Sequence, residues 1–161
     1  MGVMTTASST IAHRFAAAFN TRDVEQVIDV FTPDVTYHDL FYGTFSGHTG
    51  LRALFGRMYA EGVNHQWTMR AVAVSECRTI GEWHFEFTVS DQVPHGAGRT
   101  LRFAGVSVFE IREGRCHLYR EYFDRAAALL AVGIAPGSVS RIVRRRSSVQ
   151  VTLPKSNTLP R

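Results

Sequence analysis

The 161-residue sequence predicts an α+β fold in which helices pack on one curved antiparallel sheet. Before residue 62, apolar side chains recur at three- and four-residue steps, which is typical of amphipathic helices. From Gln66 onwards, long runs rich in β-branched and aromatic residues are separated by short turn segments, which is typical of antiparallel strands. The length suits one domain with a single hydrophobic core.

Four helices are predicted from the apolar spacing and from residues that start or stop a helix. In the first, Ile11, Phe15 and Phe19 follow one another at four-residue steps, behind a serine that can cap the helix. Pro33 ends the second helix, and glycines end the third and the fourth. The predicted helices cover residues 8–20, 23–31, 47–62 and 124–132.

Five strands are predicted from runs of β-branched and aromatic residues. One short strand lies between the second and the third helix, and four long strands follow the third helix. Short gaps that contain glycine, proline or charged residues connect the long strands as hairpins. The predicted strands cover residues 34–39, 66–74, 79–90, 99–111 and 115–123.

The chain is predicted to divide into a flexible N-terminus (residues 1–8), a folded domain (residues 9–135) and a basic, flexible tail (residues 136–161). Residues 138–161 contain six Arg or Lys and no acid, while the whole chain has a net charge of +4, so the rest carries −2. The basicity therefore belongs to the tail. A solvated appendage is the simplest interpretation, and a regulatory segment is the alternative.

The sequence shows no targeting segment and no metal-binding motif. No apolar run is long enough to span a bilayer, and the N-terminus lacks the layout of a signal peptide, so we expect a cytoplasmic protein without a membrane partner. Cys77 and Cys116 lack CxxC spacing, and the seven histidines form no HxH or HExxH motif. We therefore expect reduced thiols, no metal and no cofactor.

Three stretches of the chain resemble a known family. They are DVFTPDVTYHD (residues 29–39), GTFSGHTGLRALF (residues 43–55) and the long run GVSVFEIREGRCHLYREYFDRAAALLAVG (residues 105–133). Together with the order of the elements, they resemble the nuclear transport factor two-like superfamily and, within it, the SnoaL-like polyketide cyclases. The resemblance implies a cone-shaped α+β barrel in which helices and sheet enclose an apolar pocket for a small hydrophobic molecule.

Asp39 lies where ketosteroid isomerase-like members of that superfamily carry their general-base aspartate. A carboxylate in an apolar pocket is a stronger base than one in water and can remove a proton beside a carbonyl. The alternative is a turn residue that hydrogen-bonds its own loop. Tyr37 shares the strand parity of Asp39. Phe15 and Ser107 stand where that isomerase has its oxyanion-binding tyrosine and its protonated aspartate, so its own activity is not expected here.

Glu121 lies in LYREYFD, which resembles the WRDYFD segment of limonene epoxide hydrolase-like proteins, at the place of their catalytic aspartate. SnoaL-like cyclases have an acid/base aspartate at the same strand position. The resemblance therefore implies an acid/base role for Glu121, and a salt bridge to an arginine is the alternative. Thr88 and Ser90 stand where the arginine and aspartate of the epoxide hydrolase site would fall, so a simple epoxide hydrolase is not expected.

His84 and Glu86 alternate with Trp83, Phe85 and Phe87, so they share one face of their strand. The alternation does not say whether this face lines the cone or meets solvent. The resemblance places it in the cone, where His84 is an acid/base candidate with a pKa suited to neutral pH and Glu86 contacts substrate. A solvated histidine is the alternative.

The sequence thus predicts a small cofactor-independent enzyme that performs acid/base chemistry on a hydrophobic polyketide-like or steroid-like metabolite by cyclisation, isomerisation or dehydration. Asp39 would be the base, Glu121 or His84 the acid, and Tyr37 with Ser107 would orient a substrate oxygen. A non-catalytic module that binds a small molecule or dimerises is the alternative. We expect a homodimer and no nucleic-acid partner. The predicted aromatic walls are Phe15, Phe19, Phe41, Trp67, Phe103 and Tyr119.

Overall fold

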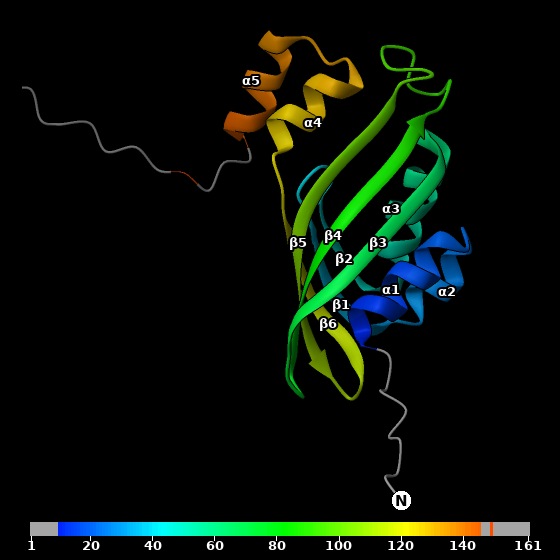
Figure 1. Cartoon of the computed structure of the whole chain (residues 1–161), viewed down its shortest axis with the longest axis vertical. Coiled ribbons are helices and arrows are strands. Elements are labelled where there is room, and N and C mark those ends of the chain that lie inside the picture. Colours follow the sequence, from blue (N-terminus) through cyan, green and yellow to red (C-terminus); the bar gives the residue numbers. More distant parts are fainter. Residues whose placement is uncertain (1–9, 146–148, 150–161) are drawn as a thin grey trace, which may run out of the picture.

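The computed structural model describes residues 10–145 and residue 149, which form five helices and six strands (Figure 1). None of the helices in these residues is long and apolar enough to cross a membrane. The helices are α1 (Ile11–Asn20), α2 (Val24–Ile28), α3 (Gly47–Glu61), α4 (Arg125–Val132) and α5 (Pro136–Arg145). The strands are β1 (Phe31–Asp39), β2 (Gly43–Ser46), β3 (Gly62–Val74), β4 (Arg78–Val89), β5 (Thr100–Arg112) and β6 (Arg115–Tyr122).

The described strands form one mixed sheet of six strands in the order β2-β1-β6-β5-β4-β3. The sheet is curved and does not close into a barrel, and α1, α2 and α3 lie along one side of it (Figure 1). The predicted α+β class is confirmed, but the prediction of a purely antiparallel sheet is wrong because β1 and β6 run parallel. Strand β2 was also missed. The β1–β6 pairing joins distant parts of the chain, for example Tyr37 with Tyr119, and local spacing carries no information about it.

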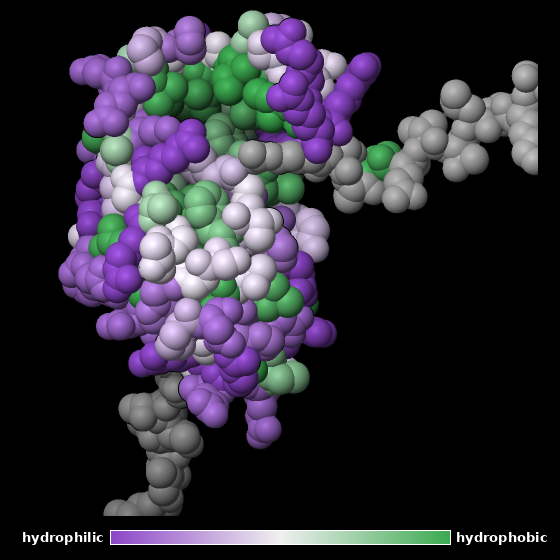
Figure 2. Space-filling model, turned by 180° about the vertical axis from the view of Figure 1, so that it is seen from behind, coloured by the Kyte–Doolittle hydropathy of each residue, from purple (hydrophilic) through white to green (hydrophobic). Residues whose placement is uncertain are grey.

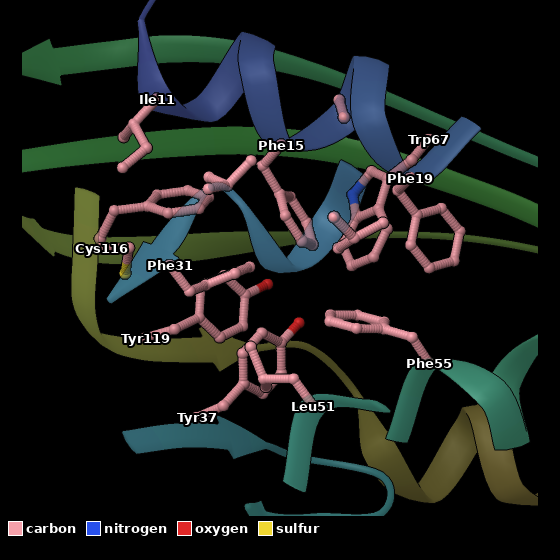
Figure 3. Packing of buried hydrophobic residues seen from close by; sticks show 14 of the residues in the cluster. Ile11, Phe15, Phe19, Phe31, Tyr37, Leu51, Phe55, Trp67, Cys116 and Tyr119 are labelled. Carbon is pink, nitrogen blue, oxygen red and sulfur yellow. The ribbon is translucent and has the colours of Figure 1, made fainter. Parts of the chain in front are cut away.

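Aromatic rings make up much of the core between α1 and the inner face of the sheet (Figure 3). Helix α1 is capped by Thr10, whose hydroxyl accepts a hydrogen bond from the backbone N–H of His13 at 3.4 Å, and not by a serine as predicted. Phe15 and Phe19, one turn apart on α1, are fully buried. The ring of Phe15 stands edge-on to that of Trp67, with centroids 4.9 Å apart. Such a contact adds about 0.5–1.5 kcal/mol to the gain from burial alone.

Helices α4 and α5 lie at one end of the molecule, where hydrophobic side chains also gather at the surface (Figure 2). Asp124 caps α4 by accepting from the N–H of Ala127 at 2.9 Å, and Gly133 follows α4 in the left-handed conformation, with φ of +102°. Helix α5 occupies part of the segment predicted as a flexible tail, and its Val139 is buried. Apart from Val149, the remainder of that tail lies outside the described residues, and so does the predicted N-terminal segment.

Two sets of contacts hold α4 against the sheet and its loops. Arg125 donates from Nη1 to the carbonyl of Leu40 at 3.3 Å and from Nη2 to that of Val143 in α5 at 3.2 Å. At the other end of α4, the turn after β4 packs so closely that a Cβ atom on Gly96 would lie 2.1 Å from the carbonyl oxygen of Val132. Helix α4 is therefore docked at both of its ends.

Candidate active site

A cavity of about 50 Å³ lies on the inner face of the sheet, between β3, β4 and β5 on one side and α3 and α4 on the other. A space of this size holds only a few water molecules. A larger ligand therefore has to displace side chains such as Phe41, Phe87 and Phe103, which are only partly buried. The lining consists of Asp39, Phe41, Tyr42, Met58, His65, Trp67, Trp83, Phe85, Phe87, Leu101, Phe103, Glu121, Phe123 and Ala128.

Two carboxyl side chains share this mostly aromatic lining. Asp39 is the last residue of β1 and Glu121 lies in β6, and their exposed fractions are 7% and 6%. The two strands are parallel neighbours in which His38 pairs with Arg120, so the next residue of each strand brings the two acids side by side on the inner face. The structure thus brings together the two acids that the sequence analysis singled out.

Asp39 accepts two hydrogen bonds from the turn that follows β1. Its Oδ1 accepts from the backbone N–H groups of Phe41 at 2.8 Å and Tyr42 at 2.6 Å. Asp39 therefore hydrogen-bonds its own turn, as the first interpretation of this residue predicted. Its carboxyl group also lines the apolar cavity, as the second interpretation predicted. Two N–H donors on one oxygen stabilise a negative charge at Asp39.

Glu121 has different surroundings. Its Oε1 accepts from the backbone N–H of Leu40 and its Oε2 from the hydroxyl of Tyr119, both at 3.0 Å. Burial, followed by the neighbouring charge of Asp39, raises the pKa of Glu121 well above its ordinary value. Among the described residues no arginine pairs with Glu121, so a salt bridge as the alternative role is wrong.

The hydroxyl groups expected to orient a substrate oxygen lie beneath the cavity lining. Tyr37 and Tyr119 are stacked with ring centroids 4.1 Å apart, both are fully buried, and their hydroxyl groups point the same way (Figure 3). The Oγ of Ser107 is engaged by Tyr119 at 2.6 Å and by the indole N–H of Trp83 at 2.8 Å. The prediction that Tyr37 and Ser107 contact substrate is therefore corrected, because neither lines the cavity.

The predicted aromatic walls divide into two groups. Phe41, Trp67 and Phe103 line the cavity. Phe15 and Phe19 pack in the core beneath it, and so does the ring of Tyr119, so their assignment to the cavity wall is corrected. Their sequence pattern is that of an inward-facing helix or strand, and the pattern does not tell a core position from a lining position.

His84 and Glu86 lie on the outer face of the sheet, away from the cavity. His84 is exposed, and Glu86 forms an ion pair with Arg102 on the neighbouring strand β5. Trp83 and Phe85 take the inner face of β4 and line the cavity instead. The predicted places of His84 as an acid and Glu86 as a substrate contact are therefore wrong, because burial of the large aromatic rings decided which face of β4 turned inward.

His65 is a lining residue that the sequence analysis missed. It lies in β3 two residues before Trp67 and therefore on the same face, but the predicted strand began one residue too late to include it. Its Nδ1 accepts from Nη1 of Arg22 at 3.0 Å, since an arginine can only donate. Burial, with the positive charge of Arg22, lowers the pKa of His65 to about 4, so its ring is neutral at pH 7. The ring lies nearly parallel to that of Phe87, at 13°.

Tyr42, three residues after Asp39, is a further aromatic lining residue that was not among the predicted site residues. Its hydroxyl donates to Oε2 of Glu61 at 2.8 Å, and the guanidinium of Arg57 lies 4.8 Å from its ring centroid. Burial raises the pKa of Tyr42 well above its ordinary value. Tyr42 therefore ties the turn that holds Asp39 to helix α3.

The fold is of the class in which helices and a curved sheet enclose a mostly apolar pocket, as in a solved structure described as an NTF2-like protein. Within that class, residues 12–119 match the model of the SnoaL-like domain, which spans more than half of the chain. The chain therefore belongs to the SnoaL-like domain family. No sequence among the curated proteins matches it.

Solved structures of the same fold include three with different descriptions. A proposed polyketide cyclase from Xanthomonas campestris pv. campestris is 18% identical with a TM-score of 0.67 over 76% of this chain and 93% of that one. A hypothetical protein from Catenulispora acidiphila with a ketosteroid isomerase-like fold is 19% identical with a TM-score of 0.68 over 80% of this chain and 98% of that one. An epoxide hydrolase of the LEH-like type from M. tuberculosis is 19% identical with a TM-score of 0.60 over 83% of this chain and 93% of that one. At these identities the similarity is one of fold.

Proposed function

We propose that the cavity is the active site of a cofactor-independent enzyme that moves protons on a hydrophobic metabolite carrying a carbonyl group or conjugated double bonds. The observation that carries this proposal is the pair of buried carboxyl groups, Asp39 and Glu121, with opposite surroundings on one aromatic cavity. Membership of the SnoaL-like family supports small-molecule chemistry at this place in the fold. Cyclisation, isomerisation and dehydration all need one group that removes a proton and one that supplies it.

The surroundings favour a different protonation state for each of the two acids. The two N–H groups that donate to Asp39 favour its ionised form. The pKa of Glu121 is raised by burial and by the charge of Asp39, which favours its protonated form. Two neighbouring carboxyl groups whose surroundings separate their protonation states provide a base and an acid in the same site.

In the proposed step, Asp39 removes a proton from a carbon atom beside the substrate carbonyl. The electrons of the broken C–H bond form a C=C bond, and the carbonyl oxygen takes the proton of Glu121 to give an enol. Where a second C=C bond is conjugated with this enol, return of the proton from Asp39 to the far carbon of that bond, with return of the enol proton to Glu121, completes an isomerisation. The aromatic lining excludes water, which strengthens the interaction of both acids with the reacting atoms.

The test uses the metabolite that copurifies with the protein, identified by native mass spectrometry and incubated with the protein in D₂O. The wild type should incorporate deuterium at the acidic carbon, and Asp39→Asn and Glu121→Gln should slow incorporation by about 10²–10⁴-fold. His84→Gln, on the outer face, is the matched control and should exchange at the wild-type rate. Unchanged exchange in Asp39→Asn would show that Asp39 is not the base.

A non-catalytic module that binds a small molecule or dimerises is the second candidate. On the outer face of β5 and β6, Val106 and Val108 lie opposite to the buried Ser107, and the side chain of Tyr122 is 57% exposed. We propose that this face forms a homodimer, and Tyr122→Arg should then shift the mass in light scattering from dimer to monomer. A wild-type monomer at high concentration excludes the dimer. A copurifying ligand that never exchanges deuterium favours the binding module.

A further inference from the structure

Three hydrogen bonds run in series beneath the cavity from Trp83 to Glu121. The indole N–H of Trp83 on β4 donates to Oγ of Ser107 on β5 at 2.8 Å. Ser107 is 2.6 Å from the hydroxyl oxygen of Tyr119 on β6, and Tyr119 donates to Oε2 of Glu121 at 3.0 Å. None of the four side chains is more than 6% exposed, so their polar atoms depend on one another for partners.

The chemistry of the donors fixes the direction of this series. An indole N–H can only donate, so Ser107 accepts from Trp83, and the hydrogen of Ser107 then needs an acceptor of its own. The hydroxyl oxygen of Tyr119 is in place to be that acceptor, which leaves the hydrogen of Tyr119 for Glu121. The opposite direction would leave the hydrogen of a fully buried serine without a partner, which is unfavourable.

Both oxygens of Glu121 therefore receive a hydrogen from the protein side, Oε1 from Leu40 and Oε2 from Tyr119. A proton carried by Glu121 itself has to occupy a lone-pair position that these donors leave open. We propose that the series Trp83–Ser107–Tyr119 orients Glu121 so that its own proton faces the cavity, with Tyr119 as the positioning residue that sets how readily this proton is released. The proposal deepens the proposed function, on which it rests for the role of Glu121 as the acid.

Tyr119 acts on Glu121 together with other polar and charged groups around the carboxyl pair. A hydroxyl that donates to a carboxylate stabilises its ionised form, so Tyr119 opposes the effects of burial and of Asp39 on the pKa of Glu121. Loss of the Tyr119 hydroxyl should therefore raise that pKa further. Among the described residues, the polar and charged groups that face the pair are Tyr37 on β1, Tyr119 on β6, Tyr42 with Glu61 and Arg57 of α3 beyond it, His65 on β3 and Arg125 on α4.

The test titrates Glu121 directly by ¹³C NMR of protein labelled at the glutamate carboxyl carbon, with Glu121→Gln to assign its signal. Tyr119→Phe should raise the titration midpoint of Glu121 by about one to two pH units, the loss expected for one hydrogen bond to a charged group. Ser107→Ala should raise it by less, because Tyr119 keeps its hydroxyl and loses only the donor behind it. Tyr59→Phe is the matched control, since the partly buried hydroxyl of Tyr59 donates to the carbonyl of Phe19 and not to Glu121.

The outcomes separate this proposal from the proposed function, because the titration needs no substrate and no turnover. An unchanged or lowered midpoint in both Tyr119→Phe and Ser107→Ala overturns the positioning role even if the enzyme is active. A wild-type Glu121 that is already ionised at pH 5 also overturns it, since there is then no proton to position. The expected shifts in a protein that never exchanges deuterium into its ligand support the positioning role and refute the catalytic one.

Discussion

Lowering the pH from 7 to 5 should destabilise the fold through protonation of His65. The pKa of His65 falls from 6.5 to about 4 on folding, because of burial and the charge of Arg22. A histidine with a lowered pKa in the folded state binds its proton more tightly in the unfolded state. Its contribution to the free energy of unfolding is therefore complete above pH 6.5 and is lost as the pH falls towards 4. With about 1.4 kcal/mol for each pKa unit, the whole shift corresponds to about 3 kcal/mol, of which about 2 kcal/mol is lost at pH 5.

Urea unfolding at pH 7 and pH 5 measures the loss of stability, and a variant that lacks the histidine separates the part due to His65 from that of other titrating groups. Glu121 contributes with the opposite sign, since its pKa is raised on folding and acidification favours its folded form. We therefore compare the wild type with His65→Gln, which cannot titrate but keeps an acceptor for Arg22. The wild type should lose about 2 kcal/mol more than His65→Gln, and His13→Gln, at an exposed position on α1, should behave as the wild type. Equal losses in wild type and His65→Gln would refute the reasoning.

Two further predictions concern the core and the docking of α4. Phe15→Ala should lower the free energy of unfolding by about 3–5 kcal/mol in urea titrations, because it removes a fully buried ring, and a loss well below that range would mean that the core can collapse around the gap. Gly96→Ala should speed amide hydrogen exchange in α4, because its Cβ would lie 2.1 Å from the carbonyl oxygen of Val132. Gly56→Ala is the control: its Cβ meets open space in α3, so this substitution should instead add about 0.8 kcal/mol of stability. Unchanged exchange in Gly96→Ala would contradict the close docking of α4.

Local patterns predicted much of the fold. The four-residue steps of Ile11, Phe15 and Phe19 placed the inner face of α1, and the helix that begins after Asp124 was found from its cap. Strand β2 was missed because Gly43–Ser46 is too short to show a period. Helix α5 was missed because its apolar stripe is brief and set among arginines.

The candidate site was predicted only in part. The strand parity of Asp39 and the place of Glu121 in its strand were readable from the sequence, and both acids line one cavity. The face occupied by His84 was not readable, because alternation groups residues by face without saying which face turns inward. His65 was missed because the predicted strand began at Gln66, four residues after the observed start of β3 at Gly62.

The sequence by itself determined which residues share a helix face or a strand face, since that follows from the fixed periods of the backbone, and it placed Asp39 and Glu121 on their strands. Only the tertiary structure decided that the two acids lie side by side, because the contact between Leu40 and Glu121 joins positions 81 residues apart. It also decided the surroundings that favour their proposed protonation states. Those depend on burial, on N–H donors from a neighbouring turn and on the hydroxyl of Tyr119, which are properties of the packed molecule and not of any local stretch.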